Sequence, residues 1–168
     1  MSKSKQAASR WLFLVVALAL ITVDQFTKNL AIATLEPGIN NPVLGEVLSW
    51  RLIYNDSAAF SLGFGQTWIL AVLATAAALA TIWFSRKITS RSWAVMAGIF
   101  LAGVVGNLID RLIREPSFGN GNVVDFIQIP FNFPVFNLAD ICIVSMAILT
   151  VIRVFRGENL GGVAPRTK

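Results

Sequence analysis

The stretch WLFLVVALALITVDQFTKNLAIA, residues 11–33, sets the fold class of this protein. Its length suits a membrane span, because about 20 helical residues cross a hydrocarbon core of about 30 Å. Two charged residues, Asp24 and Lys28, interrupt it late. The stretch is too long for the apolar region of a cleaved signal peptide, and its charged residues come late. We therefore expect a retained transmembrane helix.

Three more apolar segments follow, at about 66–85, 92–113 and 136–155. The whole chain is 55% hydrophobic and 14% charged, with a mean hydropathy of +0.67. Soluble domains are about 25% charged. The sequence therefore predicts an all-α membrane protein, a bundle of four transmembrane helices. We expect a single domain over 1–156 and a mobile cytoplasmic tail over 157–168.

The basic residues predict how the bundle is oriented. Most of the 14 Lys and Arg residues lie before the first span, between the second and third, or after the fourth. These are Lys3, Lys5, Arg10, Arg86, Lys87, Arg91, Arg153, Arg156, Arg166 and Lys168. Because cytoplasmic segments carry an excess of Lys and Arg, both termini are predicted to be cytoplasmic. The net charge of +5 then reflects topology, and we expect no nucleic-acid partner.

Two outer loops connect the spans, at about 34–65 and 114–135. In the first loop, residues 47–54 (VLSWRLIY) combine β-forming side chains with partial alternation. We expect this loop to form a small antiparallel sheet that lies on the outer end of the bundle. In the second loop, residues 122–127 (NVVDFI) indicate a short extended segment.

The chain contains no histidine and a single cysteine, Cys142. This excludes Ser-His-Asp and Cys-His catalysis, histidine-based zinc sites, internal disulfides and cysteine metal clusters. Cys142 lies among apolar neighbours and is expected to pack. Ser57 and Ser61 lack an obvious base. No phosphate loop, dinucleotide fingerprint or metal-ligand cluster is visible, so neither a cofactor nor a metal is expected.

The polar residues of three spans fall in one layer, the outer third of the membrane, at a rise of about 1.5 Å per residue. They are Asp24 and Lys28 in the first span, Asn107, Asp110 and Arg111 in the third, and Asn137 and Asp140 at the start of the fourth. Asp24 and Lys28 are four residues apart, Asn137 and Asp140 are three apart, and Asp110 and Arg111 lie three and four residues after Asn107, so we expect each span to offer one polar stripe. Because charges in lipid are costly, we expect the three faces to meet around one partly hydrated pocket.

Asp125 and Asp140 each lie in an apolar setting without an adjacent base. Asp125 is expected in the same layer, since the fourth span begins about ten residues after it. Two carboxylates in one desolvated site cannot both ionise readily, so one keeps a proton. Such a pair can activate water and protonate a carbonyl oxygen, as in aspartic proteases. The pairs Asp24–Lys28 and Asp110–Arg111 fit a purely structural role equally well.

Five motifs, in this order, resemble those of the lipoprotein signal peptidase family (signal peptidase II), bacterial intramembrane aspartyl proteases. The motifs are DQFTK (24–28), YNDSAAFS (54–61), GNLIDR (106–111), VVDF (123–126) and FNLAD (136–140). The resemblance implies that Asp125 and Asp140 are the catalytic pair. It also implies substrate-binding or supporting roles for Asp24, Lys28, Asn55, Asn107, Asp110, Arg111 and Asn137.

The same resemblance implies a substrate and a location. Family members remove the signal peptide from diacylglyceryl-modified prolipoproteins by cleaving before the lipidated cysteine, without a cofactor. The sheet of the first outer loop would be the family's β-cradle. We expect a monomer in the bacterial cytoplasmic membrane, in contact with membrane lipids, with its active site near the outer face. One departure is Ser57, where the family often has glycine.

Two other functions fit part of the sequence. A proton-coupled transporter would use intramembrane carboxylates as proton sites, but it predicts a central acid and repeat symmetry, and neither is visible. A non-catalytic assembly factor would use polar residues to hold helices together. That function predicts balanced charges, whereas the outer side has more acids than bases.

Overall fold

The computed structural model describes residues 3–56 and 67–160. The helices are α1 (Lys3–Thr34), α2 (Thr67–Ser85), α3 (Arg91–Ile113) and α4 (Leu138–Phe155), and the strands are β1 (Asn41–Leu44), β2 (Leu48–Asn55) and β3 (Val123–Gln128). All four helices are long and apolar enough to cross a membrane, which confirms the predicted spans. Ser57, Ser61 and residues 161–168 of the predicted tail lie outside the described residues.

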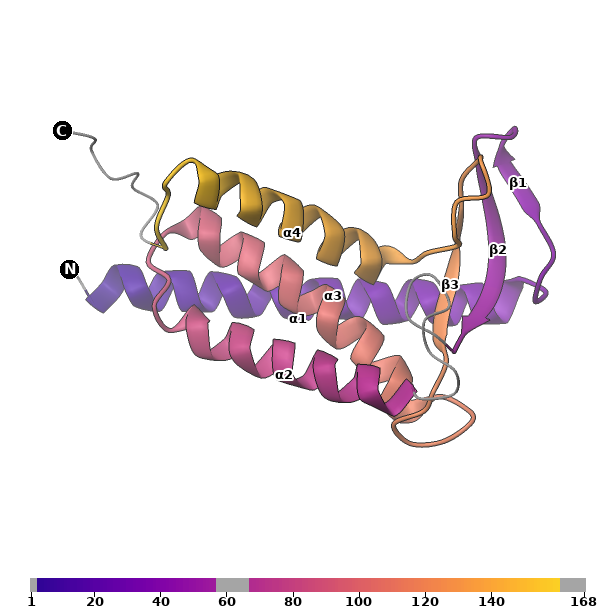
Figure 1. The fold of residues 1–168 in the computed structure, drawn as a ribbon, viewed down its shortest axis with the longest axis horizontal. Coiled ribbons are helices and arrows are strands. Elements are labelled where there is room, and N and C mark those ends of the chain that lie inside the picture. The colour runs from indigo at the N-terminus through magenta and orange to yellow at the C-terminus, as the bar shows by residue number, and fades with distance from the viewer. Residues whose placement is uncertain (1–2, 57–66, 161–168) are drawn as a thin grey trace.

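Helix α3 is the centre of the bundle, and α1, α2 and α4 pack around it (Figure 1). Glycines on α3 permit this close approach. A side-chain carbon at Gly103 would collide with the carbonyl oxygen of Ala139 on α4, and one at Gly106 would collide with the Asp24 carboxylate on α1. Small residues at helix interfaces are the usual way in which membrane helices pack closely.

The predicted antiparallel sheet is present and lies across one end of the bundle, with the strand order β1-β2-β3 (Figure 1). The first outer loop supplies only β1 and β2. The second loop adds β3, with Ser49 opposite Gln128 and Asn55 opposite Val123. The extended segment predicted at 122–127 is thus a full member of the sheet. Pairing satisfies its backbone groups, and Val124 is fully buried.

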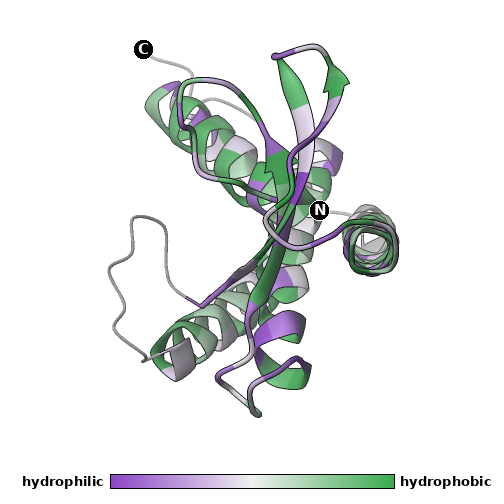
Figure 2. Cartoon of the chain, turned by 90° about the vertical axis from the view of Figure 1, so that its right-hand side faces the viewer, coloured by the Kyte–Doolittle hydropathy of each residue, from purple (hydrophilic) through white to green (hydrophobic). Residues whose placement is uncertain are grey.

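Two hydrophobic clusters hold the molecule together. One lies between the helices and includes Phe13, Trp93 and Leu101. The other lies beneath the sheet, where Ala31 of α1 packs with Leu52 of β2. Many other apolar side chains of the helices are exposed, as expected for surfaces that face lipid. Figure 2 shows hydrophobic residues along the helices and hydrophilic segments in the loops near the sheet.

Candidate active site

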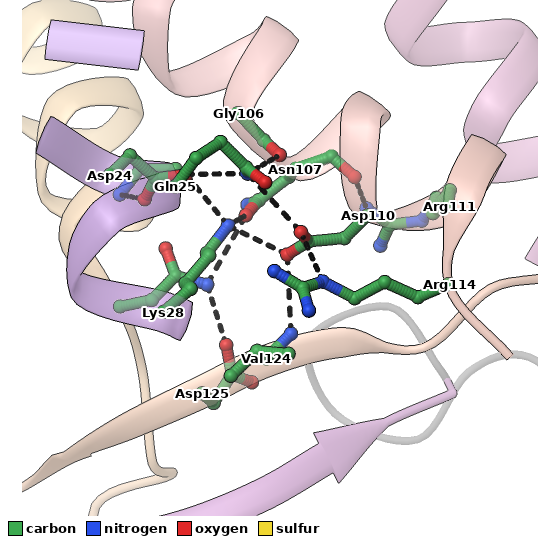
Figure 3. Close-up of polar contacts among 12 residues, drawn as sticks. Asp24, Gln25, Lys28, Gly106, Asn107, Asp110, Arg111, Arg114, Val124 and Asp125 are labelled. Atoms are coloured by element: carbon green, nitrogen blue, oxygen red, sulfur yellow. Dashed lines mark hydrogen bonds and ion pairs between the residues drawn. The ribbon is translucent and has the colours of Figure 1, made fainter. Parts of the chain in front are cut away.

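The Lys28 side chain is the centre of a buried ion cluster at the sheet end of the bundle (Figure 3). Its Nζ lies 2.9 Å from Asp24 Oδ2 and 2.8 Å from Asp110 Oδ2. It also donates a hydrogen bond of 2.9 Å to Asn107 Oδ1. Three acceptors thus match the three protons of the ammonium group. The predicted Asp24–Lys28 pair is confirmed, and Asp110 joins it from α3.

Both carboxylates of this cluster also hold backbone next to the predicted catalytic residues. Asp24 Oδ1 accepts a 3.0 Å hydrogen bond from the N–H of Ala139, which directly precedes Asp140. Asp110 Oδ2 accepts a 3.2 Å bond from the N–H of Val124, which directly precedes Asp125. A single cluster on α1 and α3 therefore fixes the start of α4 and the middle of β3.

Amide side chains hold the two predicted catalytic carboxylates. Asn55 Nδ2 donates to Asp125 Oδ2 at 2.8 Å, and Asn137 Nδ2 donates to Asp125 Oδ1 at 2.6 Å. Asn107 Nδ2 donates to Asp140 Oδ1 at 2.8 Å. The backbone N–H of Asn137 donates to Asp140 Oδ2 at 3.1 Å. Asn137 thus contacts both carboxylates, so the pair shares one site.

The surroundings of Asp125 favour its protonated form. The residue is 2% exposed. Burial first, and then the negative charge of Asp140, raise the pKa of Asp125 from 3.8 to about 7, although the hydrogen bonds from Asn55 and Asn137 oppose this rise. Near neutral pH the Asp125 carboxyl therefore holds a proton about half of the time. A proton donor and a proton acceptor can thus coexist in this site.

Arg111 does not form the ion pair with Asp110 that the sequence suggested. Asp110 pairs with Arg114 at 2.7 Å and not with its neighbour Arg111. Residues four apart share a helix face, whereas adjacent residues point in different directions. Arg111 instead donates to the backbone oxygen of Asn107 at 3.3 Å, and its charge interacts with Asp140 and with Asp125.

Two further residues, Gln25 and Arg114, belong to the network, although they were not among the residues expected from the sequence. Gln25 Nε2 donates to the Gly106 carbonyl oxygen at 3.0 Å and to Asp110 Oδ1 at 3.2 Å. The spacing of four residues between Asp110 and Arg114 was a usable signal. Gln25 lies within the DQFTK motif, but nothing in its spacing distinguishes it from an exposed residue.

An apolar groove of about 360 Å³ begins at Asp140. Phe133 and Phe136 form its wall near the sheet, and it continues along α4 past Val144 and Ile148. The site therefore opens onto a surface that suits a hydrophobic chain. Within residues 3–56 and 67–160, no group of three or more His, Cys, Asp or Glu side chains is placed to hold a metal ion.

A family model described as Signal peptidase (SPase) II matches residues 16–156 of the chain. Two similar curated proteins are both named Lipoprotein signal peptidase. The protein from Leifsonia xyli subsp. xyli is 43% identical over 148 residues, which cover 88% of this chain and 68% of that protein. The protein from Mycobacterium avium is 40% identical over 157 residues, which cover 94% of this chain and 86% of that protein.

Two solved structures, each described as a bacterial membrane enzyme, have a similar fold. The structure at 2.3 Å resolution has a TM-score of 0.77 and 26% identity, and the match covers 85% of this chain and 87% of the other. The structure at 1.9 Å has a TM-score of 0.76 and 26% identity, with coverage of 86% and 92%. The similarity therefore extends over the bundle and the sheet together.

Proposed function

The chain belongs to the signal peptidase II family, and from that premise we propose that it is an aspartic endopeptidase of lipoprotein precursors. Its substrates are diacylglyceryl-modified prolipoproteins, and it removes their signal peptide by cleaving before the lipidated cysteine. Asp125 and Asp140 are the catalytic residues. The observation that carries this proposal is the contact of Asn137 with both carboxylates in one buried site.

Peptide hydrolysis can be carried out by the Asp125–Asp140 pair when the two carboxyl groups together hold one proton. The ionised carboxylate takes a proton from a water molecule, whose oxygen attacks the scissile carbonyl carbon. The protonated carboxyl donates its proton to the carbonyl oxygen, so that a neutral tetrahedral diol forms. When the C–N bond breaks, the carboxyl that took the water proton passes it to the leaving nitrogen, and the other carboxylate takes a proton from one diol hydroxyl. A carboxylic acid and an amine are released, and the pair again holds one proton. Because Asp125 and Asp140 titrate as a coupled pair, the roles of acid and base are assigned to the pair and not to either residue.

The groove beside Asp140 supports a hydrophobic substrate. Apart from Asp140 and Ser145, the side chains that line it are apolar, so an apolar chain attached near the scissile bond can lie along α4. Burial of such a chain contributes binding energy of about 0.8 kcal/mol per CH₂ group. We therefore expect a modified precursor to bind more tightly than its unmodified form.

The orientation in the membrane is part of the proposal. Lys87, Arg91 and Arg156 lie at the end of the bundle opposite the sheet, the end where excess positive charge favours the cytoplasm. The sheet, Asp125 and Asp140 are then at the outer face of the bacterial cytoplasmic membrane. A lipid-anchored cysteine at that surface would have its peptide bond at the depth of the site.

A cleavage assay in detergent tests this function. Wild-type protein, Asp125→Asn and Asp140→Asn are each given one diacylglyceryl-modified precursor and the same precursor without the modification. We expect only wild type to cleave, and only the modified form. Glu46→Gln is the matched control, because Glu46 is exposed on the turn between β1 and β2. Full cleavage by either aspartate variant would overturn the assignment of the pair.

A further inference from the structure

A second apolar cleft lies at the end of the bundle opposite the sheet. Helices α2 and α4 pack on two sides of α3 and diverge there (Figure 1). Between them is a cleft of about 520 Å³. Its lining includes Ala80 and Phe84 of α2, Trp93 and Phe100 of α3, and Ala147 and Val151 of α4. The volume falls within the range of about 300–1,000 Å³ that is typical of ligand-binding clefts.

Basic side chains lie against the rings that line this cleft. Lys87 Nζ is 5.5 Å from the centroid of the Phe84 ring, and Arg153 Cζ is 5.1 Å from the centroid of a Trp93 ring. Glu158 lies 3.2 Å from Arg153. Lys87, by contrast, has no carboxylate within 4.0 Å in the part of the chain that the structure describes. Lys87 therefore leaves a positive charge at the end of the cleft that no described carboxylate pairs with.

The cleft wall also contains a polar group without a partner. Trp93 is 5% exposed, and its indole N–H is buried without a hydrogen-bond acceptor among the described residues. A buried donor without a partner costs about 1–3 kcal/mol.

We propose that this cleft binds one anionic phospholipid. An acyl chain lies against the apolar wall, and the phosphate lies near Lys87 and Arg153. Basic pockets between membrane helices on the cytoplasmic side bind anionic headgroups in this way. The signal peptide of a precursor is a poorer occupant, because it begins with a positively charged region that these two cations would repel. This site is separate from Asp125 and Asp140, and cleavage plays no part in its test.

Lipid binding is measured by native mass spectrometry on delipidated full-length protein in a neutral detergent. The probes are palmitoyl-oleoyl phosphatidylglycerol, phosphatidylcholine with the same chains, and glycerol phosphate, which has no chains. We expect phosphatidylglycerol to bind more tightly than phosphatidylcholine and glycerol phosphate not to bind. Lys87→Gln should weaken the binding of phosphatidylglycerol about fivefold, which is the effect of one basic residue near a charged headgroup. Arg91→Gln removes the same charge at the same end and should retain most of the affinity.

Filling the cleft gives an independent test. Ala80→Phe introduces a ring into the cleft and should reduce phosphatidylglycerol binding at least tenfold. Ala19→Phe makes the same change at an exposed position on α1 and should bind as wild type does. Thermal unfolding verifies that each variant is folded. Equal affinity for the two lipids, binding of glycerol phosphate, normal binding by Ala80→Phe, or displacement of the lipid by a synthetic signal peptide would each overturn the proposal.

Discussion

The buried charge of Lys28 helps to position neighbouring segments of the chain more than it stabilises the fold. Its side chain is fully buried, and so are the carboxylates of Asp24 and Asp110 beside it. Such ion clusters seldom stabilise a protein more than apolar residues of the same size would. Here, however, the two carboxylates also bind the N–H groups of Ala139 and Val124. The cluster therefore sets the relative position of the two segments that carry the proposed catalytic pair.

Replacing Lys28 should separate this positional role from a role in stability. Lys28→Met leaves the buried Asp24 carboxylate without its cation and Asp110 with Arg114 alone, so the free energy of unfolding should fall by about 3–5 kcal/mol, measured by thermal unfolding in detergent. Adding Asp24→Asn removes one excess charge and should restore part of that stability. Cleavage should be lost in the single variant. It should also be lost in the double variant, because the contact with Ala139 is altered. Recovery of normal cleavage would contradict the positional role.

The protonation of Asp125 predicts how activity depends on pH. Its pKa is raised to about 7, so the pair loses its proton as the pH rises through that value. The kcat/KM for precursor cleavage should therefore fall above about pH 7. The unfolded carboxyl releases its proton near its ordinary pKa of 3.8, so the folded state binds more protons between these values. Stability should consequently decrease as the pH rises from about 4 to about 7.

Asp125→Asn provides the control for this pH dependence. The amide cannot titrate, so the variant should lose the fall in stability between about pH 4 and pH 7. Melting temperatures of wild type and variant across that range make the comparison. If the two pH profiles have the same shape, Asp125 does not have a raised pKa in the folded protein.

At the scale of single elements, the first turn of α4 is built around Asp140, one of the two proposed catalytic residues. Asn137 caps the helix, and its side chain accepts a hydrogen bond from the N–H of Asp140. In return, the Asp140 carboxylate accepts a hydrogen bond from the backbone N–H of Asn137. This capping box satisfies two free N–H groups and fixes the direction of the Asp140 carboxylate. One motif, FNLAD, thus begins the helix and orients its catalytic group.

The contact between α3 and α4 should be sensitive to a single methyl group. Gly103→Ala places a carbon against the Ala139 carbonyl oxygen, next to Asp140, so the backbone must shift. We expect a loss of about 1–3 kcal/mol in stability, which is typical of overpacking, together with slower cleavage. Ala19→Val adds methyl groups at an exposed position and should change neither property. If Gly103→Ala has the stability and cleavage rate of wild type, the interface between α3 and α4 can accommodate an added methyl group.

At the scale of the whole molecule, α1 connects the sheet end of the bundle with the opposite end. Phe13 packs in the cluster between the helices, whereas Ala31 packs beneath the sheet. At the end away from the sheet, Gln6 donates to the carbonyl oxygen of Arg86, and Ser9 donates to that of Thr89. These contacts fix α1 against the turn between α2 and α3. The sheet and the site therefore stand at a defined end of one continuous bundle.

The proposed orientation can be tested by cysteine labelling in intact cells. In a Cys142→Ala background, Glu46→Cys places a thiol on the exposed turn between β1 and β2, and Glu158→Cys places one beyond α4. A maleimide that cannot cross membranes should label Glu46→Cys alone, and Glu158→Cys only after the cells are opened. The reverse pattern would place the sheet, and with it Asp125 and Asp140, on the cytoplasmic side.

The sequence alone determined the spans, the candidate residues and the family resemblance. Span length and apolar content are local properties, and a carboxylate in an apolar segment is conspicuous wherever it lies. Helical spacing predicted the Asp24–Lys28 pair because residues four apart share a face. The five motifs are likewise visible along the chain before any fold is known.

Tertiary structure alone decided which groups meet. Asn55 and Asp125 come from separate loops, and only the pairing of β2 with β3 brings them within 2.8 Å. Likewise, the hydrogen bond that the Ala139 N–H donates to Asp24 Oδ1 depends on how α1 and α4 sit against α3. Sequence spacing fixes directions within one element, whereas contacts between elements depend on packing that no single segment encodes.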